Sequence, residues 1–227
     1  MKSISRIARA AAVAACLCAS AQLAAQTLTL PPVDEAPAAD STWASFKARL
    51  LAALARRDSK FILSIVDPQI RNTTEIRGSA EFNKLWQPQA KESPLWIELR
   101  KILFLGSVLV KEERAPAEYC APYVYYKWPE DAPAEAAGAV TAQDVLLKSR
   151  PSAQSQTLQT LGYDLVGVLD WEVADESAET TQKWVQVRRD NISGYVPDEQ
   201  IRSPLEYRAC FRRIGTRWRM TGLEVGE

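Results

Sequence analysis

Two carboxylates spaced two residues apart form the clearest candidate for a catalytic pair in this sequence. Asp170 and Glu172 flank Trp171 in the segment LDWEV. Side chains at positions i and i+2 of a strand share one face, and two carboxylates on one face could act as acid and base in glycoside hydrolysis. The longer run LDWEVADESAE is also typical of a solvated acidic loop. A cell-envelope hydrolase built on these two carboxylates is therefore one hypothesis.

Histidine is missing from the whole chain of 227 residues. The commonest general base, the commonest metal ligand and the usual partner of a nucleophilic Ser or Cys are thus missing as well. The sequence has no P-loop, GxGxxG or HExxH motif, and its only closely spaced cysteines are Cys16 and Cys18. These features exclude a zinc site of four cysteines, or of cysteine with histidine. We expect a non-enzymatic protein without a cofactor or a bound metal.

Recognition of a ligand is the other use for the same acidic and aromatic region. An outward face carrying both aromatic rings and carboxylates suits a cationic or peptide ligand. The candidate ligand-binding residues are Trp184, Asp170, Glu172 and Tyr195. The competing interpretation is that Trp184 only covers one end of its domain.

A strip of arginines lies near the C-terminus, with Glu206 as the only acid among them. Its members are Arg202, Arg208, Arg212, Arg213, Arg217 and Arg219. Such a strip could meet an anionic glycan, lipid headgroups or an acidic partner. Arginine also keeps exposed hairpins soluble, and this alternative stays open.

Residues 1–26 have the organisation of a secretory signal peptide: three basic residues, a short apolar stretch and small residues suited to cleavage, best after Ala21. The segment VAAC, ending at Cys16, weakly resembles a lipoprotein box, but a soluble product is favoured. After cleavage, 25 of the 28 basic residues remain against 28 acidic ones, which argues against a nucleic-acid partner. No later segment is long and apolar enough to span a membrane. We expect a secreted, periplasmic protein.

Only two cysteines, Cys120 and Cys210, remain after cleavage. In an oxidising compartment they predict one disulfide. It would close a loop of about ninety residues and stabilise the fold by roughly 4 kcal/mol. Two separately buried thiols are the alternative.

Helical patterns dominate the region from 41 to 129. Apolar residues recur at spacings of three and four in TWASFKARLLAAL, and further helices are expected in SKFILSIV, SAEFNKLW and SPLWIELRKILFL. The region ends in a β segment, YCAPYVYYKWP. Core packing best explains the apolar stripes, although Trp-rich helices could instead enclose an apolar ligand, which would make the protein a carrier or a structural protein.

The chain around the helices divides into further units. Residues 27–40 contain three prolines and predict a flexible tether, and residues 130–139 predict a linker or a short Ala-rich helix. From 139 to 204, short apolar segments alternate with turns, as in a small barrel or sandwich. Residues 205–227 predict a β-hairpin that docks on the N-terminal region, because a lone hairpin is marginal in water.

Three segments in the region 139–204 resemble the bacterial SH3-type (SH3b) family. They are VLLKSRPS at 145–152, WVQV at 184–187 and GYV at 194–196, with Gly162 before the second strand. Leu146 and Arg150 stand where the family pattern has Asn and Gly, and VADESAETT replaces a short turn. The resemblance implies a non-catalytic barrel of five or six strands that binds peptidoglycan or protein segments in the cell envelope.

The expected fold class is α+β: an N-terminal helical region, a small SH3-like β-barrel and a C-terminal β-hairpin. The expected function is a binding or scaffold protein that recognises cell-wall material or an envelope protein. An envelope hydrolase and a carrier of apolar ligands remain the alternatives.

Overall fold

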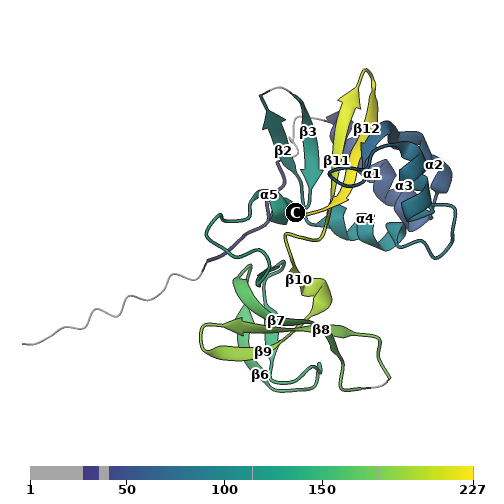
Figure 1. The fold of residues 1–227 in the computed structure, drawn as a ribbon. Coiled ribbons are helices and arrows are strands. Elements are labelled where there is room, and N and C mark those ends of the chain that lie inside the picture. Colours follow the sequence, from purple (N-terminus) through teal and green to yellow (C-terminus); the bar gives the residue numbers. More distant parts are fainter. Residues whose placement is uncertain (1–27, 36–40, 114, 178, 227) are drawn as a thin grey trace, which may run out of the picture.

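The protein folds into two bodies, each built around its own β-sheet (Figure 1). The computed structural model describes residues 28–35, 41–113, 115–177 and 179–226. The first body comprises residues 41–126 and 207–225 and holds the helices. The second body comprises residues 137–202. The predicted signal peptide, residues 1–26, lies outside the described residues.

Among the residues that the structure describes, helices occur only in the first body, apart from one short 3-10 turn. They are α1 (Ser41–Ala55), α2 (Ser59–Ile65), α3 (Ser79–Trp86), α4 (Leu95–Phe104) and α5 (Tyr123–Tyr126), and the 3-10 turn is η1 (Asp198–Gln200). The strands are β1 (Val66–Arg71), β2 (Val108–Glu112), β3 (Ala115–Ala121), β4 (Ala137–Val140), β5 (Val145–Lys148), β6 (Thr157–Leu161), β7 (Leu165–Ala174), β8 (Lys183–Arg189), β9 (Ile192–Pro197), β10 (Ile201–Arg202), β11 (Tyr207–Ile214) and β12 (Arg217–Val225). None of the helices among the described residues has the length and apolar character needed to cross a membrane.

The first body packs α1–α4 on one face of a five-stranded sheet with the order β1-β12-β11-β3-β2. β1 runs parallel to β12, and the other pairs are antiparallel. The apolar stripe of α1 supplies Trp43 and Phe46, which pack against Phe211 of β11 and Trp218 of β12 with ring centroids 5.0 to 5.8 Å apart. The periodicity of α1 is therefore explained by burial on the C-terminal hairpin.

The second body is a seven-stranded sheet with the order β10-β4-β7-β8-β9-β5-β6. Small β-branched side chains fill its separate core, among them Val145, Val185, Val187 and Val196. β7 has two register shifts against β8 between Val168 and Val173, as expected of β-bulges. These shifts break the simple alternation of inward and outward side chains along β7.

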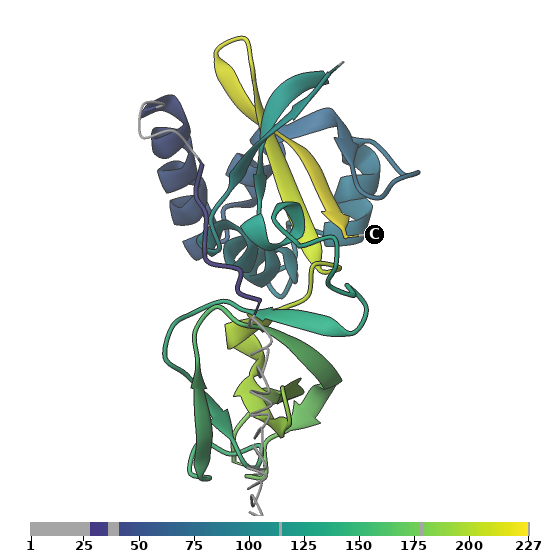
Figure 2. The ribbon, with the colours of Figure 1, turned by 90° about the vertical axis from the view of Figure 1, so that its left-hand side faces the viewer.

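Residues 28–35 join the two bodies, so the expected tether does not describe them. Thr29 forms an antiparallel bridge with Asp164 of the second body. Glu35 donates its backbone N–H to the carbonyl of Ser107 at 2.7 Å, next to β2 of the first body. Leu30 is buried in a shared cluster with residues of both bodies. The segment crosses the junction between the two bodies in Figure 2. The burial of Leu30 fixes the segment there, which its proline content did not predict.

The expected fold class is wrong. The N-terminal region is interrupted by β1, β2 and β3 and is not mostly helical, and the C-terminal hairpin supplies β11 and β12 to the five-stranded sheet. In place of a small SH3-like barrel, residues 137–202 form a sheet of seven strands. The cause is long-range pairing: β1 and β3 contact strands that lie far away in the sequence, and local periodicity carries no information about such partners.

Candidate anion-binding site

The four predicted ligand-binding residues do not form one outward face. Asp170 and Glu172 are exposed on β7, and the Asp170 carboxylate accepts the backbone N–H of Glu172 at 3.0 Å. Tyr195 is half-buried on β9. Trp184 is only 2% exposed, and its indole N–H donates to Asp175 Oδ2 at 2.7 Å. The expected outward position of Trp184 is thus wrong: Trp184 and the adjacent Val185 are both buried, and the Trp184 indole is held by Asp175 of the segment after β7.

Replacing Trp184 is expected to change stability first. Trp184→Ala removes a fully buried ring and should lower the free energy of unfolding by about 3 kcal/mol or more. Trp184→Phe keeps most of the ring and loses the hydrogen bond to the Asp175 carboxylate, for a loss of about 2 kcal/mol. Urea unfolding of both variants checks this. A Trp184→Ala variant as stable as the parent would show that the ring is not buried.

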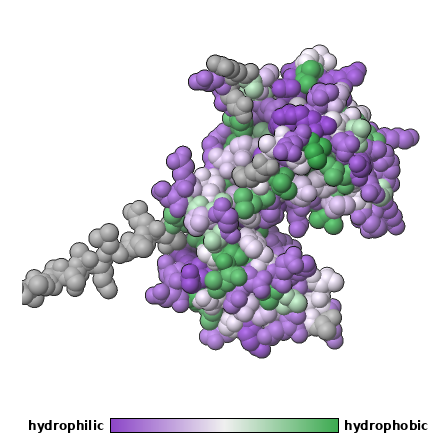
Figure 3. All heavy atoms as spheres, in the orientation of Figure 1, coloured by the Kyte–Doolittle hydropathy of each residue, from purple (hydrophilic) through white to green (hydrophobic). Residues whose placement is uncertain are grey.

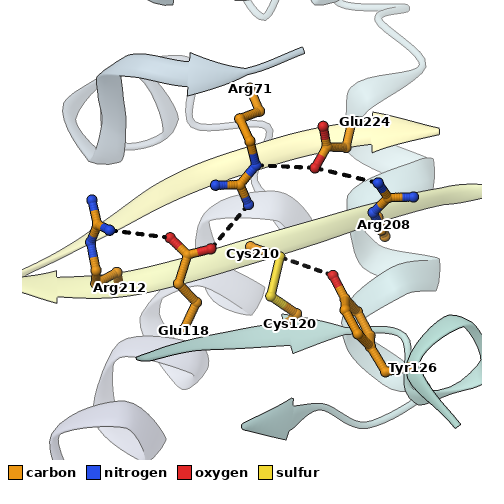
Figure 4. The surroundings of a disulfide bond; sticks show 8 residues. All are labelled: Arg71, Glu118, Cys120, Tyr126, Arg208, Cys210, Arg212 and Glu224. Atoms are coloured by element: carbon orange, nitrogen blue, oxygen red, sulfur yellow. Dashed lines mark hydrogen bonds and ion pairs between the residues drawn. A yellow bond between two sulfur atoms is a disulfide. The ribbon is translucent and has the colours of Figure 1, made fainter. Parts of the chain in front are cut away.

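The predicted disulfide is confirmed. Cys120 and Cys210 are directly opposite each other on β3 and β11 and are joined by an S–S bond of 2.09 Å across 90 residues of sequence. Both side chains are buried at the base of a pocket on the sheet face that the α1–α4 helices leave uncovered. The disulfide therefore fixes two strands whose other side chains build that pocket (Figure 4).

This pocket, called the arginine pocket below, has a volume of about 420 Å³. It is lined by strands β1, β2, β3, β11 and β12, by α5 and by the loop after β1. Its charged and aromatic lining residues are Arg71, Arg77, Arg208, Arg212, Glu118, Glu224, Tyr125 and Tyr126. Four arginines against two glutamates leave two positive charges in the lining.

Arg71 is the centre of the charged network. Its Nη2 donates to Glu118 Oε2 at 3.0 Å and its Nε donates to Glu224 Oε1 at 3.1 Å. Burial lowers the pKa of the Arg71 guanidinium, but the hydrogen bonds and charges of Glu118 and then Glu224 outweigh burial, so that this pKa is raised overall. Arg71 therefore stays charged and bridges β3 to β12.

Arg208 and Arg212 approach the same two carboxylates from β11. Arg208 Nη2 lies 3.6 Å from Glu224 Oε1, and its guanidinium carbon sits 4.1 Å from the centre of the Tyr125 ring in a cation–π contact. Arg212 Nη1 lies 3.6 Å from Glu118 Oε1. Both contacts are longer than the hydrogen bonds of Arg71. Arg208 is also held by a hydrogen bond from its Nη1 to the Val225 carbonyl at 2.8 Å, so Arg212 is the looser part of the network.

Two further residues shape the pocket around Arg71. A Cβ atom at Gly222 would lie 2.9 Å from Arg71 Nη2, so glycine allows the guanidinium to lie close against β12. The Tyr126 hydroxyl lies 3.1 Å from Cys210 Sγ. Burial raises the pKa of Tyr126, and the phenol stays protonated at neutral pH.

The arrangement provides more hydrogen-bond donors than its own carboxylates can accept. Three guanidiniums carry roughly fifteen N–H donors, whereas two carboxylates offer about eight lone-pair sites. An anion with several oxygens, such as a carboxylate, fits this excess because arginine binds such groups in a bidentate manner. The Glu118 carboxylate also lies within 4.8 Å of both cysteine sulfurs, but these sulfurs are bonded to each other and offer no thiolate to a metal.

The sequence signalled half of this site. Arg208 and Arg212 belong to the predicted arginine strip, which the structure divides: Arg202 is instead buried between Glu98 and Glu206. Arg71 and Glu118 had no recognisable signal, because they come from β1 and β3, which meet the C-terminal hairpin only in the folded sheet. Alternation along the β11–β12 hairpin could have placed Arg208, Arg212 and Glu224 on one face.

Comparisons with known proteins add little to this geometry. No protein-family model and no curated protein matches the chain. Among solved structures, a designed NTF2-like protein is similar with 10% sequence identity and a TM-score of 0.28, over 82% of this chain and 96% of the other. This score is too low to compare the two folds further. The SH3b resemblance stays a prediction.

Proposed function

We propose that this protein is an exported, non-enzymatic binding protein that holds a carboxylate-bearing ligand of the cell envelope in the arginine pocket. The observation that carries the proposal is the excess of guanidinium donors around Arg71, Arg208 and Arg212 in a pocket of about 420 Å³. Pockets of this size take a small molecule or a short peptide segment.

Peptidoglycan is the favoured ligand, because its peptides carry free carboxylates, and an acidic segment of an envelope protein is the alternative. The disulfide below the pocket supports export, since such bonds persist in oxidising compartments. The predicted signal peptide points the same way. The pocket replaces the face around Trp184 as the proposed recognition surface, because that ring is buried.

Co-sedimentation with purified peptidoglycan sacculi tests the proposal, using the chain without its predicted signal peptide. The test variant is Arg77→Gln with Arg212→Gln, which removes two charges from the pocket lining. A hydrogen bond to a charged group contributes about 1.5 to 3 kcal/mol, so we expect binding to fall at least tenfold. High salt should weaken binding by the parent protein.

The matched control is Arg213→Gln with Arg217→Gln, which removes the same charge from exposed positions that do not line the pocket. This control should leave binding within twofold of the parent. Equal loss in both variants would mean that binding depends on net charge and not on the pocket. Binding that neither variant alters would reject the pocket, and soluble fragments released from the sacculi would favour a hydrolase.

A further inference from the structure

A second hollow lies between the two bodies, bordered by α4 on one side and by η1 and β10 on the other. Figure 3 shows the molecule indented at this junction. The hollow, called the junction groove below, has a volume of about 420 Å³. Its base is closed by Arg202, whose side chain is 4% exposed and forms ion pairs with Glu98 of α4 and with Glu206.

The α4 wall of the junction groove exposes two large apolar side chains. Ile97 is 55% exposed and Phe104 is 70% exposed. They are seven residues apart, which places them on one face of the helix about 10 Å apart along its axis. A single exposed apolar residue is ordinary, but two on one helix face that border the same groove form a patch available for contact.

The charges of the two walls are opposite and balanced. Arg100 and Lys101 line the α4 wall, and Asp198 and Glu199 of η1 line the other. In the part of the chain that the structure describes, the ion pairs across the junction are those of Arg202, and none joins these four residues to one another. A strongly acidic or basic partner would be attracted by one wall and repelled by the other.

We propose that the junction groove is the interface of a two-fold symmetric dimer of this chain. A two-fold axis places the basic α4 wall of one copy against the acidic η1 wall of the other, and the reverse contact forms at the same time. Ile97 and Phe104 then supply the apolar centre, with the charges at its rim. The charge pattern of the two walls is thus complementary to itself, which is not true of a surface with one sign of charge. The inference is independent of the proposed ligand of the arginine pocket.

Sedimentation velocity from micromolar to submillimolar concentration tests the apolar centre. We expect a reversible dimer, which Phe104→Gln weakens roughly thirtyfold or more, the effect typical of an aromatic residue at the centre of an interface. Leu85→Gln is the matched control, because Leu85 is 52% exposed on α3 outside the junction groove. It should leave the association unchanged.

A charge exchange tests the symmetry. One variant carries Arg100→Glu and Lys101→Glu, and the other carries Asp198→Lys and Glu199→Lys. Each alone places like charges opposite each other and should be monomeric, whereas an equimolar mixture should form the mixed dimer. Circular dichroism and thermal unfolding confirm that both variants are folded. A parent that is monomeric at every concentration, or a mixture that does not associate, would overturn the proposal.

Discussion

Removing the disulfide is expected to lower the free energy of unfolding by about 4 kcal/mol. The bond closes a loop of 90 residues, and the chain entropy that it removes from the unfolded state corresponds to this value. The double variant Cys120→Ala with Cys210→Ala tests the effect by urea unfolding against the oxidised parent. Because the pair joins β3 to β11 directly, the whole first body should be affected.

Reduction provides the control for this variant. Dithiothreitol should destabilise the parent under conditions that expose the bond and leave the double variant unchanged. If parent and variant unfold at the same urea concentration with the same denaturant dependence, the two strands are held by their hydrogen bonds and core contacts, and the loop-closure account fails.

Replacing Trp43 is expected to lower the free energy of unfolding by about 4 kcal/mol. The ring is 1% exposed and has Tyr119 at 4.9 Å and Trp218 at 5.0 Å between centroids. Trp43→Ala leaves a large cavity where α1 meets the sheet, and losses of 3 to 5 kcal/mol are typical of such a change. Chemical denaturation measures this loss of unfolding free energy. The fluorescence of the remaining tryptophans provides a second readout of the same transition.

Phe104→Ala is the control for Trp43→Ala. It also removes an aromatic ring from a helix, but that ring is 70% exposed, so its loss should alter stability by less than about 0.5 kcal/mol at concentrations where the chain is monomeric. A Trp43→Ala variant that loses no more than this control would mean that α1 does not depend on the sheet for its stability.

Local patterns in the sequence determined several elements of this protein. The apolar spacing around Trp43 and Phe46 predicts α1, and the Ser-Pro start of α4 and the turn between Arg189 and Ile192 are also readable from nearby residues. The cysteine count predicted the disulfide. The helices and the turn were predicted from residues that are neighbours in the sequence. The disulfide was predicted because Cys120 and Cys210 are the two cysteines that remain after the predicted signal cleavage.

The tertiary structure alone decided how these elements combine. Arg71 reaches Glu224 only because β1 lies parallel to β12, a pairing between strands about 150 residues apart. Trp184 is buried although it alternates with the core residue Val185 along β8, because its indole lies against the segment after β7 and donates to Asp175, a contact that alternation along one strand does not reveal. The arginine pocket and the junction groove therefore could not be read from the sequence, because both are formed by residues that long-range pairing and the contact between two bodies bring together.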